Sequence, residues 1–310
     1  MSEQKILIIG SGAMACLVAA RLSKAGKNII MLGHWAEALQ TIRRDGITLH
    51  YNGKNFQTPP LEITDQPDQI GQIEHAIVLV KSWQTEKAAQ QLRQCLRKNG
   101  IALTLQNGMG NREMLAQYLG ANRVALGIAT MGAFLQAPGK VQYGGEGKIS
   151  LSIHDRLGFL KEALLQSGFE VEEVVDPDSL LWGKLVVNSA INPLTALLDV
   201  PNGALLERPT ARAMMINLAR ETAAVAHSLR IPLPFDNPAA HVEEVAARTA
   251  NNYSSMLQDV RRCAPTEIDA ISGAIVHAGE QADVPTPLNE IMWQLVKAKV
   301  YSRTSPQPRG

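Results

Sequence analysis

The first half of the chain alternates short apolar runs with helix-length segments. The apolar runs occupy residues 5–9, 28–32, 76–80, 101–105, 124–130, 148–153 and 169–175. Apolar runs without polar alternation are typical of parallel strands that are buried on both faces of a sheet. Because helix-like segments separate the runs, we predict an α/β domain with a Rossmann-type, doubly wound sheet. The Asn52-Gly53 pair lies between alternating runs and predicts a two-residue hairpin beside that sheet.

The second half of the chain has the pattern of an all-α domain. Helices are expected near residues 179–192, 209–229, 239–261, 266–281 and 286–300, with prolines between them. A turn-forming segment, Asp176-Pro177-Asp178, precedes the first helix. We therefore predict a Rossmann-type domain over residues 1–176 and a helical domain over residues 177–310. Pro193 disfavours helical geometry at Asn192, which predicts that the first helix ends or kinks there.

A polar stripe interrupts the first of these helices. Lys184, Asn188 and Asn192 recur at every fourth residue in a segment that is otherwise almost wholly apolar. A step of four residues advances about 40° beyond a full helical turn, so the three side chains span roughly 80° of the helix surface. An unpartnered ammonium against an apolar core is costly. We therefore expect the stripe to line a cleft and meet a polar ligand. The alternative is that Lys184 reaches solvent and the asparagines bond to neighbouring helices.

A glycine-rich turn follows the first apolar run. The segment Gly10-Ser11-Gly12-Ala13-Met14-Ala15 has the pattern G-x-G-x-x-A between a predicted strand and a predicted helix. Gly10 permits a tight turn, Gly12 allows a pyrophosphate to approach the backbone, and Ala15 lets the helix pack closely on the sheet. The helix N-terminus offers free N–H groups to phosphate. The pattern predicts dinucleotide binding.

The end of the second strand favours NADP over NAD. An NAD site usually has Asp or Glu there, whereas this chain has Gly33-His34-Trp35. His34 could contact a 2′-phosphate, and Arg43 or Arg44 could reach it; alternatively, both arginines face solvent. Two further polar residues, Lys81 and Asn107, follow apolar runs and are expected at the carboxyl ends of strands, where ligands bind. Their alternatives are a solvated loop lysine and a turn-forming Asn-Gly pair.

The helical half contains two further polar sites. Asn252 and Ser255 lie in the segment NNYSSM, which falls within the helix predicted over residues 239–261. Thr266 has the character of a helix N-cap, which places Glu267 in the first turn. The helix dipole favours a carboxylate there, and this explains Glu267 without any catalytic role.

Composition narrows the class of protein. The 310 residues carry a net charge of +1, which gives no strong attraction to nucleic acid or to an anionic membrane. The three cysteines are far apart and form neither a disulfide framework nor a metal site. No signal peptide pattern and no membrane-spanning apolar run is evident. We expect a cytoplasmic protein, for which a homodimer remains open.

Several of these motifs together resemble one enzyme family. The segments LWGKLVVNSAINPLTAL, NNYSSMLQDV and PTEID, with VKSWQ, QNGMG and the glycine turn, are similar to those of the ketopantoate reductase (2-dehydropantoate 2-reductase) family. The resemblance covers nearly the whole chain in the same order. It implies a Rossmann domain, a helical domain and an active site between them. It also implies reduction of 2-dehydropantoate to (R)-pantoate with NADPH, a step of pantothenate biosynthesis in the coenzyme A pathway.

The resemblance also implies roles for individual residues. Lys184 corresponds to the catalytic lysine and Glu267 to its acidic partner. The implied substrate-binding residues are Asn188, Asn192, Ser255 and Asn252, and the implied cofactor-side residues are Lys81 and Asn107. The six residues of the glycine turn and His34 complete the predicted cofactor site on the strength of the sequence pattern described above. Members of the family often carry Arg where this chain has His34, so this position departs from the pattern.

The implied mechanism is a hydride transfer with Lys184 as general acid. A desolvated site lowers the pKa of Lys184, while Glu267 opposes that shift. No metal is required, because the cofactor carries the hydride chemistry. Two alternatives stay open: reduction of a different branched 2-keto acid, and a catalytically silent NADP-binding sensor.

Overall fold

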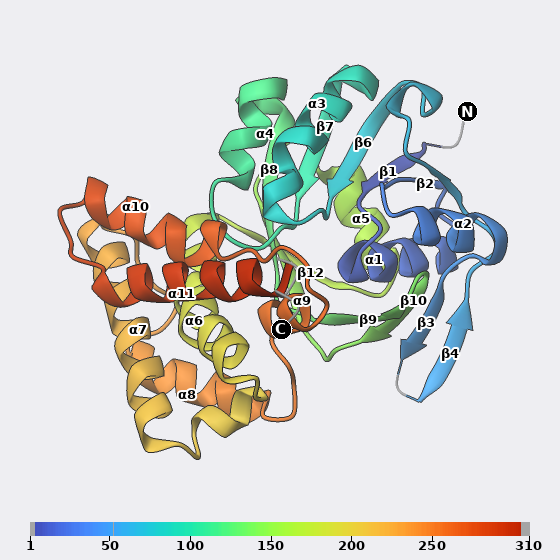
Figure 1. Cartoon of the computed structure of the whole chain (residues 1–310). Helices are drawn as coiled ribbons and strands as arrows, with labels where there is room; N and C mark the ends of the chain where they lie inside the picture. The colour runs from blue at the N-terminus through green and yellow to red at the C-terminus, as the bar shows by residue number, and fades with distance from the viewer. Residues whose placement is uncertain (1–3, 52, 305–310) are drawn as a thin grey trace. The chain divides into compact units, whose positions relative to one another are not determined.

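The chain folds into two compact units. A computed structural model describes residues 4–51 and 53–304, and Figure 1 labels most of its helices and strands. Unit 1 comprises Met1–Gln106 and Asn111–Pro177, and unit 2 comprises Asn107–Gly110 and Asp178–Gly310. The short segment Asn107–Gly110 therefore belongs to the helical unit, although its neighbours in the sequence belong to unit 1.

The main sheet of unit 1 has the strand order β12-β11-β8-β7-β6-β1-β2-β5 over the residues described. Its pairs are parallel except for β8 with β11, which is antiparallel. The strands are β1 (Ile6–Ile9), β2 (Ile29–Leu32), β5 (Glu62–Thr64), β6 (Ile73–Val78), β7 (Leu96–Thr104), β8 (Val124–Ala129), β11 (Lys148–Ser152) and β12 (Glu170–Val174). The order β5-β2-β1-β6-β7-β8 is that of a doubly wound dinucleotide-binding sheet, which confirms the predicted fold class of this half.

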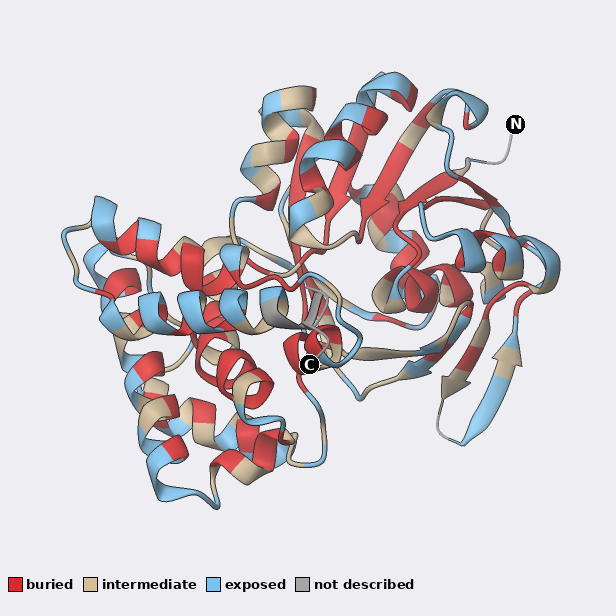
Figure 2. Ribbon diagram, in the orientation of Figure 1, coloured by how far each residue is buried: buried red, intermediate tan, exposed pale blue. Residues whose placement is uncertain are grey.

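Helices cover both faces of this sheet. The helices are α1 (Ala13–Lys24), α2 (Ala36–Asp45), α3 (Thr85–Cys95), α4 (Asn111–Leu119) and α5 (Gly158–Gln166), with short 3₁₀ turns at Pro67–Gln69, Ser82–Gln84 and Ala121–Arg123. In β1, Ile6 and Ile8 join the core with α1, α2 and α5, whereas Leu7 and Ile9 join a second core with α3 and α4. Burial of successive residues on opposite faces explains the unbroken apolar run, and Figure 2 shows the strand as buried throughout.

A second, smaller sheet lies beside the first within unit 1. It has the order β4-β3-β10-β9 and consists of β3 (Thr48–Tyr51), β4 (Lys54–Gln57), β9 (Ala133–Ala137) and β10 (Lys140–Tyr143). Tyr51 pairs with Lys54, which confirms the predicted hairpin, although Asn52 of its turn lies outside the described residues. Three strands were not predicted. Pro138 and the nearby glycines obscure the alternation of polar and apolar residues in β9 and β10, and β5 is too short to show a pattern.

Unit 2 is helical over the residues described. Its helices are α6 (Pro177–Leu198), α7 (Pro209–Ser228), α8 (Pro238–Arg248), α9 (Ser255–Arg261), α10 (Ala274–Gln281) and α11 (Pro287–Thr304), with a 3₁₀ turn at Asn202–Leu205 and a π-helical turn at Asp269–Gly273. Trp182 and Leu185 of α6 pack in one hydrophobic cluster, and Val186 and Ile191 pack in another. A helix between two clusters is apolar nearly all round, as its sequence indicated.

Local predictions in this unit differ from the structure. Helix α6 does not end at Asn192 but continues through Pro193 to Leu198, so of the two expected effects of the proline only a kink stays a prediction. A proline removes one backbone hydrogen bond, and packing against both clusters outweighs that loss. Thr266 is not the N-cap of the following helix, which begins with the π-helical turn and has Ile268 at its N-cap position.

The prediction of a single helix over residues 239–261 is also wrong. Helix α8 ends at Arg248 and α9 begins at Ser255, so Asn252 lies in the break and not within a helix. The backbone of this break pairs elsewhere: the Asn202 N–H donates to the Asn252 carbonyl at 3.0 Å. The side chain of Ser254 accepts from the Leu257 N–H and begins the new helix.

Candidate active site

Lys184 lies at the centre of a hydrogen-bonded cluster within unit 2. Its Nζ donates to Oδ1 of Asn107 at 2.7 Å, and Nδ2 of Asn107 donates to Oε2 of Glu267 at 3.3 Å. Glu267 is only 4% exposed, and Lys184 is half-buried. One amide therefore links the ammonium of α6 to a buried carboxylate and holds both side chains in place.

The environment changes the acidity of Lys184. Burial lowers its pKa from 10.5 to about 8, and the Glu267 carboxylate acts in the opposite direction. Burial disfavours a charged ammonium, whereas a neighbouring negative charge favours it. An amine with a pKa near 8 is largely protonated at neutral pH, yet gives up its proton far more readily than a solvated lysine. These are the properties of a general acid.

Backbone contacts position Asn107 in this cluster. The Met109 N–H donates to the Ala270 carbonyl at 2.9 Å, in the π-helical turn that follows Glu267. Gly108 has a φ of +80°, and a Cβ there would lie 2.6 Å from the Ala270 carbonyl oxygen. Close packing and backbone geometry thus require a glycine at position 108. Sequence reasoning assigned Asn107 to the cofactor and missed its contact with Lys184 and Glu267.

The remaining predicted substrate residues lie on α6, on α9 and in the break before α9. Asn192 is 8% exposed, and Asn188, Ser255 and Asn252 are half-buried. The side chains of these four residues form no hydrogen bond with other described residues. Amide and hydroxyl groups that are partly buried and unpaired are suited to bind a polar ligand. Helical spacing places Asn188 and Asn192 on the same stripe as Lys184.

The glycine turn of unit 1 follows β1 at the carboxyl edge of the main sheet. Gly10 has a φ of +127°, and a Cβ there would lie 3.0 Å from the Leu79 carbonyl oxygen and 3.3 Å from the Ala15 Cβ. The turn therefore requires a glycine at position 10 and a small residue at position 15. Ser11 is 8% exposed and Ala15 is completely buried, while Ala13 and Met14, half-buried, begin α1.

Gly12 has a different reason to be glycine. Its φ of −81° suits any residue, and a Cβ there would meet no atom within 4 Å. Among the residues that the structure describes, no packing excludes a side chain here and no side chain caps the N-terminus of α1. Open space in front of uncapped helix N–H groups is the arrangement that a pyrophosphate requires. The residues present therefore fit a dinucleotide.

Of the residues that could contact a 2′-phosphate, the two arginines are bonded elsewhere and only His34 is available. His34 is exposed, follows β2 and Gly33, and its Nε2 lies 3.0 Å from Nε2 of Gln91 on α3. Arg43 donates to the Ile63 carbonyl at 2.8 Å, and Arg44 pairs with Asp45. Both arginines are therefore engaged away from His34, which leaves the histidine as the candidate contact for a 2′-phosphate.

The ends of β6 and β7 carry two further polar residues. Lys81 follows β6 and is half-buried. Gln106 follows β7, is 7% exposed, and donates to the Val80 carbonyl at 3.0 Å and to the Thr85 hydroxyl at 2.8 Å. Gln106 thus ties the two strand ends together next to Asn107. Gln106 entered the sequence-based predictions only as part of the QNGMG segment. Its position directly after an apolar run could have indicated a role at the end of the strand.

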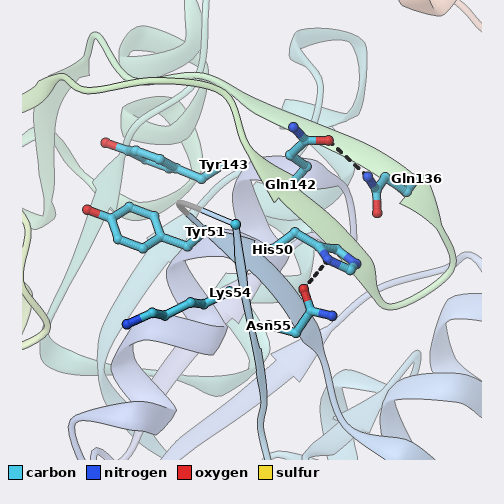
Figure 3. Close-up of a pocket in the computed structure, with 8 residues that line it drawn as sticks. His50, Tyr51, Lys54, Asn55, Gln136, Gln142 and Tyr143 are labelled. Carbon is cyan, nitrogen blue, oxygen red and sulfur yellow. Dashed lines mark hydrogen bonds between the residues drawn. The ribbon is translucent and has the colours of Figure 1, made fainter.

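Other features of the described residues add no further site. A shallow polar depression of about 350 Å³ on the small sheet is lined by His50, Tyr51, Gly53, Lys54, Asn55, Gln136, Gln142 and Tyr143 (Figure 3). None of the predicted site residues lines it. Within residues 4–51 and 53–304, no group of three His, Cys, Asp or Glu side chains could hold a metal. In that same part of the chain, no helix has the length and apolarity needed to cross a bilayer.

A Rossmann-type unit with a glycine turn, followed by a helical unit with a buried lysine cluster, defines the class of nicotinamide-dependent oxidoreductases. Two family models match the chain: ketopantoate reductase PanE/ApbA over residues 6–156, and the C-terminal part of ketopantoate reductase PanE/ApbA over residues 177–300. The chain belongs to the ketopantoate reductase family.

Individual relatives agree with this assignment. The 2-dehydropantoate 2-reductase of Halobacterium salinarum is 33% identical over 94% of this chain and 98% of that protein. The crystal structure of a PanE/ApbA family ketopantoate reductase from Ralstonia eutropha superposes with a TM-score of 0.91 at 27% identity, over 97% of this chain and 100% of that one. A D-mandelate dehydrogenase in complex with NADH and anilino(oxo)acetate has the same TM-score at 30% identity, again over 97% of this chain and 100% of that one.

Proposed function

We propose that the protein reduces 2-dehydropantoate to (R)-pantoate, with NADPH as the hydride donor and Lys184 as the general acid. The observation that carries the proposal is the Lys184–Asn107–Glu267 cluster, in which hydrogen bonds hold an ammonium whose pKa burial lowers to about 8 against the opposing effect of Glu267. Membership of the ketopantoate reductase family and the likeness to the Halobacterium salinarum enzyme support the choice of substrate.

A nicotinamide coenzyme, when bound, supplies the hydride that reduces the keto carbon. The glycine turn Gly10–Ala15 and the N-terminus of α1 would hold its pyrophosphate, with Lys81 at the carboxyl edge of the same sheet. The preference for NADPH rests on the missing acidic residue after β2 and on His34. Because the D-mandelate dehydrogenase structure contains NADH, the test below is run with both coenzymes.

The chain's own residues perform the acid step. Lys184 stabilises the negative charge that develops on the carbonyl oxygen and donates its proton there. Asn107 accepts from Nζ of Lys184 and so fixes the direction of the ammonium. Glu267 keeps that ammonium protonated. Asn188, Asn192 and Ser255 bind the carboxylate and hydroxyl of the substrate through neutral hydrogen bonds, and Asn252 assists from the break before α9.

A second candidate is the reduction of another branched or aromatic 2-keto acid. The likeness to D-mandelate dehydrogenase at 30% identity favours keeping it, since pocket shape discriminates between such acids. A catalytically silent NADP-binding sensor is the third possibility. A sensor would not need a buried lysine that is linked to a buried carboxylate.

A substrate panel tests the proposal. The loss of NADPH absorbance is measured with 2-dehydropantoate, with other branched 2-keto acids and with benzoylformate, and the series is repeated with NADH. The proposal predicts the highest kcat/KM for 2-dehydropantoate with NADPH. A higher kcat/KM for benzoylformate would show that the substrate is an aromatic 2-keto acid and not 2-dehydropantoate. Binding of NADPH without turnover of any keto acid would favour the sensor. The homodimer and the cytoplasmic location remain predictions.

A further inference from the structure

Two buried hydroxyl groups join the helices that carry the proposed substrate-binding side chains. Oγ1 of Thr195 lies 2.7 Å from Oγ of Ser254. Thr195 is completely buried and Ser254 is 6% exposed. Thr195 is three residues beyond Asn192 on α6, and Ser254 immediately precedes Ser255 at the start of α9. The hydroxyl pair therefore connects α6 to the start of α9 within three residues of Asn192 and one residue of Ser255.

Each hydroxyl is also bonded to the backbone of its own helix. Oγ1 of Thr195 lies 3.0 Å from the carbonyl oxygens of Ile191 and Asn192. Oγ of Ser254 accepts from the Leu257 N–H at 3.1 Å as the N-cap of α9. A continuous set of hydrogen bonds thus runs from the backbone at Asn192 to the first turn of α9.

The hydroxyl pair is a directional contact among apolar side chains. Ala196, Met256 and Leu257, the neighbours of the two residues in the sequence, pack in one hydrophobic cluster. Apolar contacts would hold the two helices together but would tolerate small shifts between them. A buried hydrogen bond fixes distance and direction, because removal of either hydroxyl would cost the other one of its partners away from water, although each keeps its bond to its own helix.

We propose that Thr195 and Ser254 are positioning residues that fix the separation of Asn192 and Ser255 and so determine the affinity for the keto acid. The inference deepens the proposed function and rests on it for the nature of the ligand. Both hydroxyls are bonded within the helical unit and neither contacts Lys184, Asn107 or Glu267 by a hydrogen bond, so their loss should act on substrate binding and leave the acid step of Lys184 intact.

The test compares Thr195→Val with Thr195→Ser. Valine keeps the branched shape without the hydroxyl, and serine keeps the hydroxyl without the methyl group. Thr195→Val should raise KM for the keto acid about tenfold, which corresponds to one lost hydrogen bond. Its kcat and its Kd for NADPH should stay within about twofold of the wild type. Thr195→Ser should keep KM near the wild-type value. Adding Ser254→Ala to Thr195→Val should raise KM little further, because the bond is already lost.

Several results would overturn the inference. These are an unchanged KM in Thr195→Val, an equal rise in Thr195→Ser, or a parallel loss of kcat and NADPH affinity, which would indicate a general structural role. Crystal structures of the variants give a readout that does not need turnover. The Asn192 and Ser255 side chains should shift relative to each other by more than about 0.5 Å in Thr195→Val but not in Thr195→Ser; unchanged positions contradict the inference. A wild-type protein that reduces no 2-keto acid defeats the proposed function, and the structures still decide the role of the hydroxyl pair.

Discussion

Replacement of Glu267 by glutamine should change the pH dependence of reduction more than its maximal rate. Glu267→Gln keeps an oxygen that can accept from Nδ2 of Asn107, so the link to Lys184 is preserved. The substitution removes the negative charge that raises the pKa of Lys184. The pKa should therefore fall below its present value of about 8.

The size of the effect follows from titration of a single acid. A general acid must be protonated, so kcat/KM of the wild type should fall as the pH rises through about 8. An opposite charge nearby shifts a pKa by about 1 unit or more, so the midpoint of Glu267→Gln should lie near or below about pH 7. At about pH 8 the wild type is half protonated and the variant about one-tenth protonated, a difference of about fivefold. At about pH 6 both are largely protonated and the difference should nearly vanish.

The assay is kcat/KM for the keto acid at saturating NADPH across this pH range. Glu280→Gln is the matched control, because its carboxylate is 68% exposed and screened by solvent; its profile should coincide with that of the wild type. The reasoning is refuted if Glu267→Gln retains the wild-type midpoint. It is equally refuted if the variant loses the same factor at about pH 6 as at about pH 8, since Glu267 would then act without changing the charge of Lys184.

Three further substitutions test the coenzyme site and the lysine cluster. Gly12→Val should raise Kd for NADPH by about tenfold or more while Tm stays near the wild-type value, because its side chain enters open space; fluorescence titration and calorimetry measure the two, and a normal Kd would exclude the pyrophosphate from this turn. His34→Asp should shift the ratio of Kd values towards NADH by about tenfold or more, through repulsion of the 2′-phosphate; an unchanged ratio would remove His34 from coenzyme selection. Asn107→Ala should lower kcat by about tenfold or more, because the ammonium loses its 2.7 Å hydrogen bond; an unchanged kcat in stopped-flow measurements would show that this bond does not orient the acid.

The sequence predicted those parts of the structure that depend on local pattern. Strand β1 was predicted from its unbroken apolar run, and the turn after it from the spacing of its glycines. Few other folds combine these two features in this order. The stripe of Lys184, Asn188 and Asn192 is a property of a single helix, so its geometry follows from residue spacing alone. The Asn52-Gly53 hairpin is local for the same reason.

Contacts between distant segments could not be predicted in this way. Lys184 and Asn107 are 77 residues apart, and their hydrogen bond depends on the packing of Asn107–Gly110 against the π-helical turn. The break before α9 arises from backbone pairing with Asn202, which no local pattern indicates. The continuation of α6 past Pro193 likewise reflects burial between two clusters, which overrides the local preference of proline.

Turnover of Lys184→Ala tests the central claim most directly. The account predicts that kcat falls by at least about 100-fold, the contribution of a positioned general acid, while Kd for NADPH stays within about twofold because the glycine turn is untouched. Reduction of 2-dehydropantoate at the wild-type rate by this variant would contradict the account.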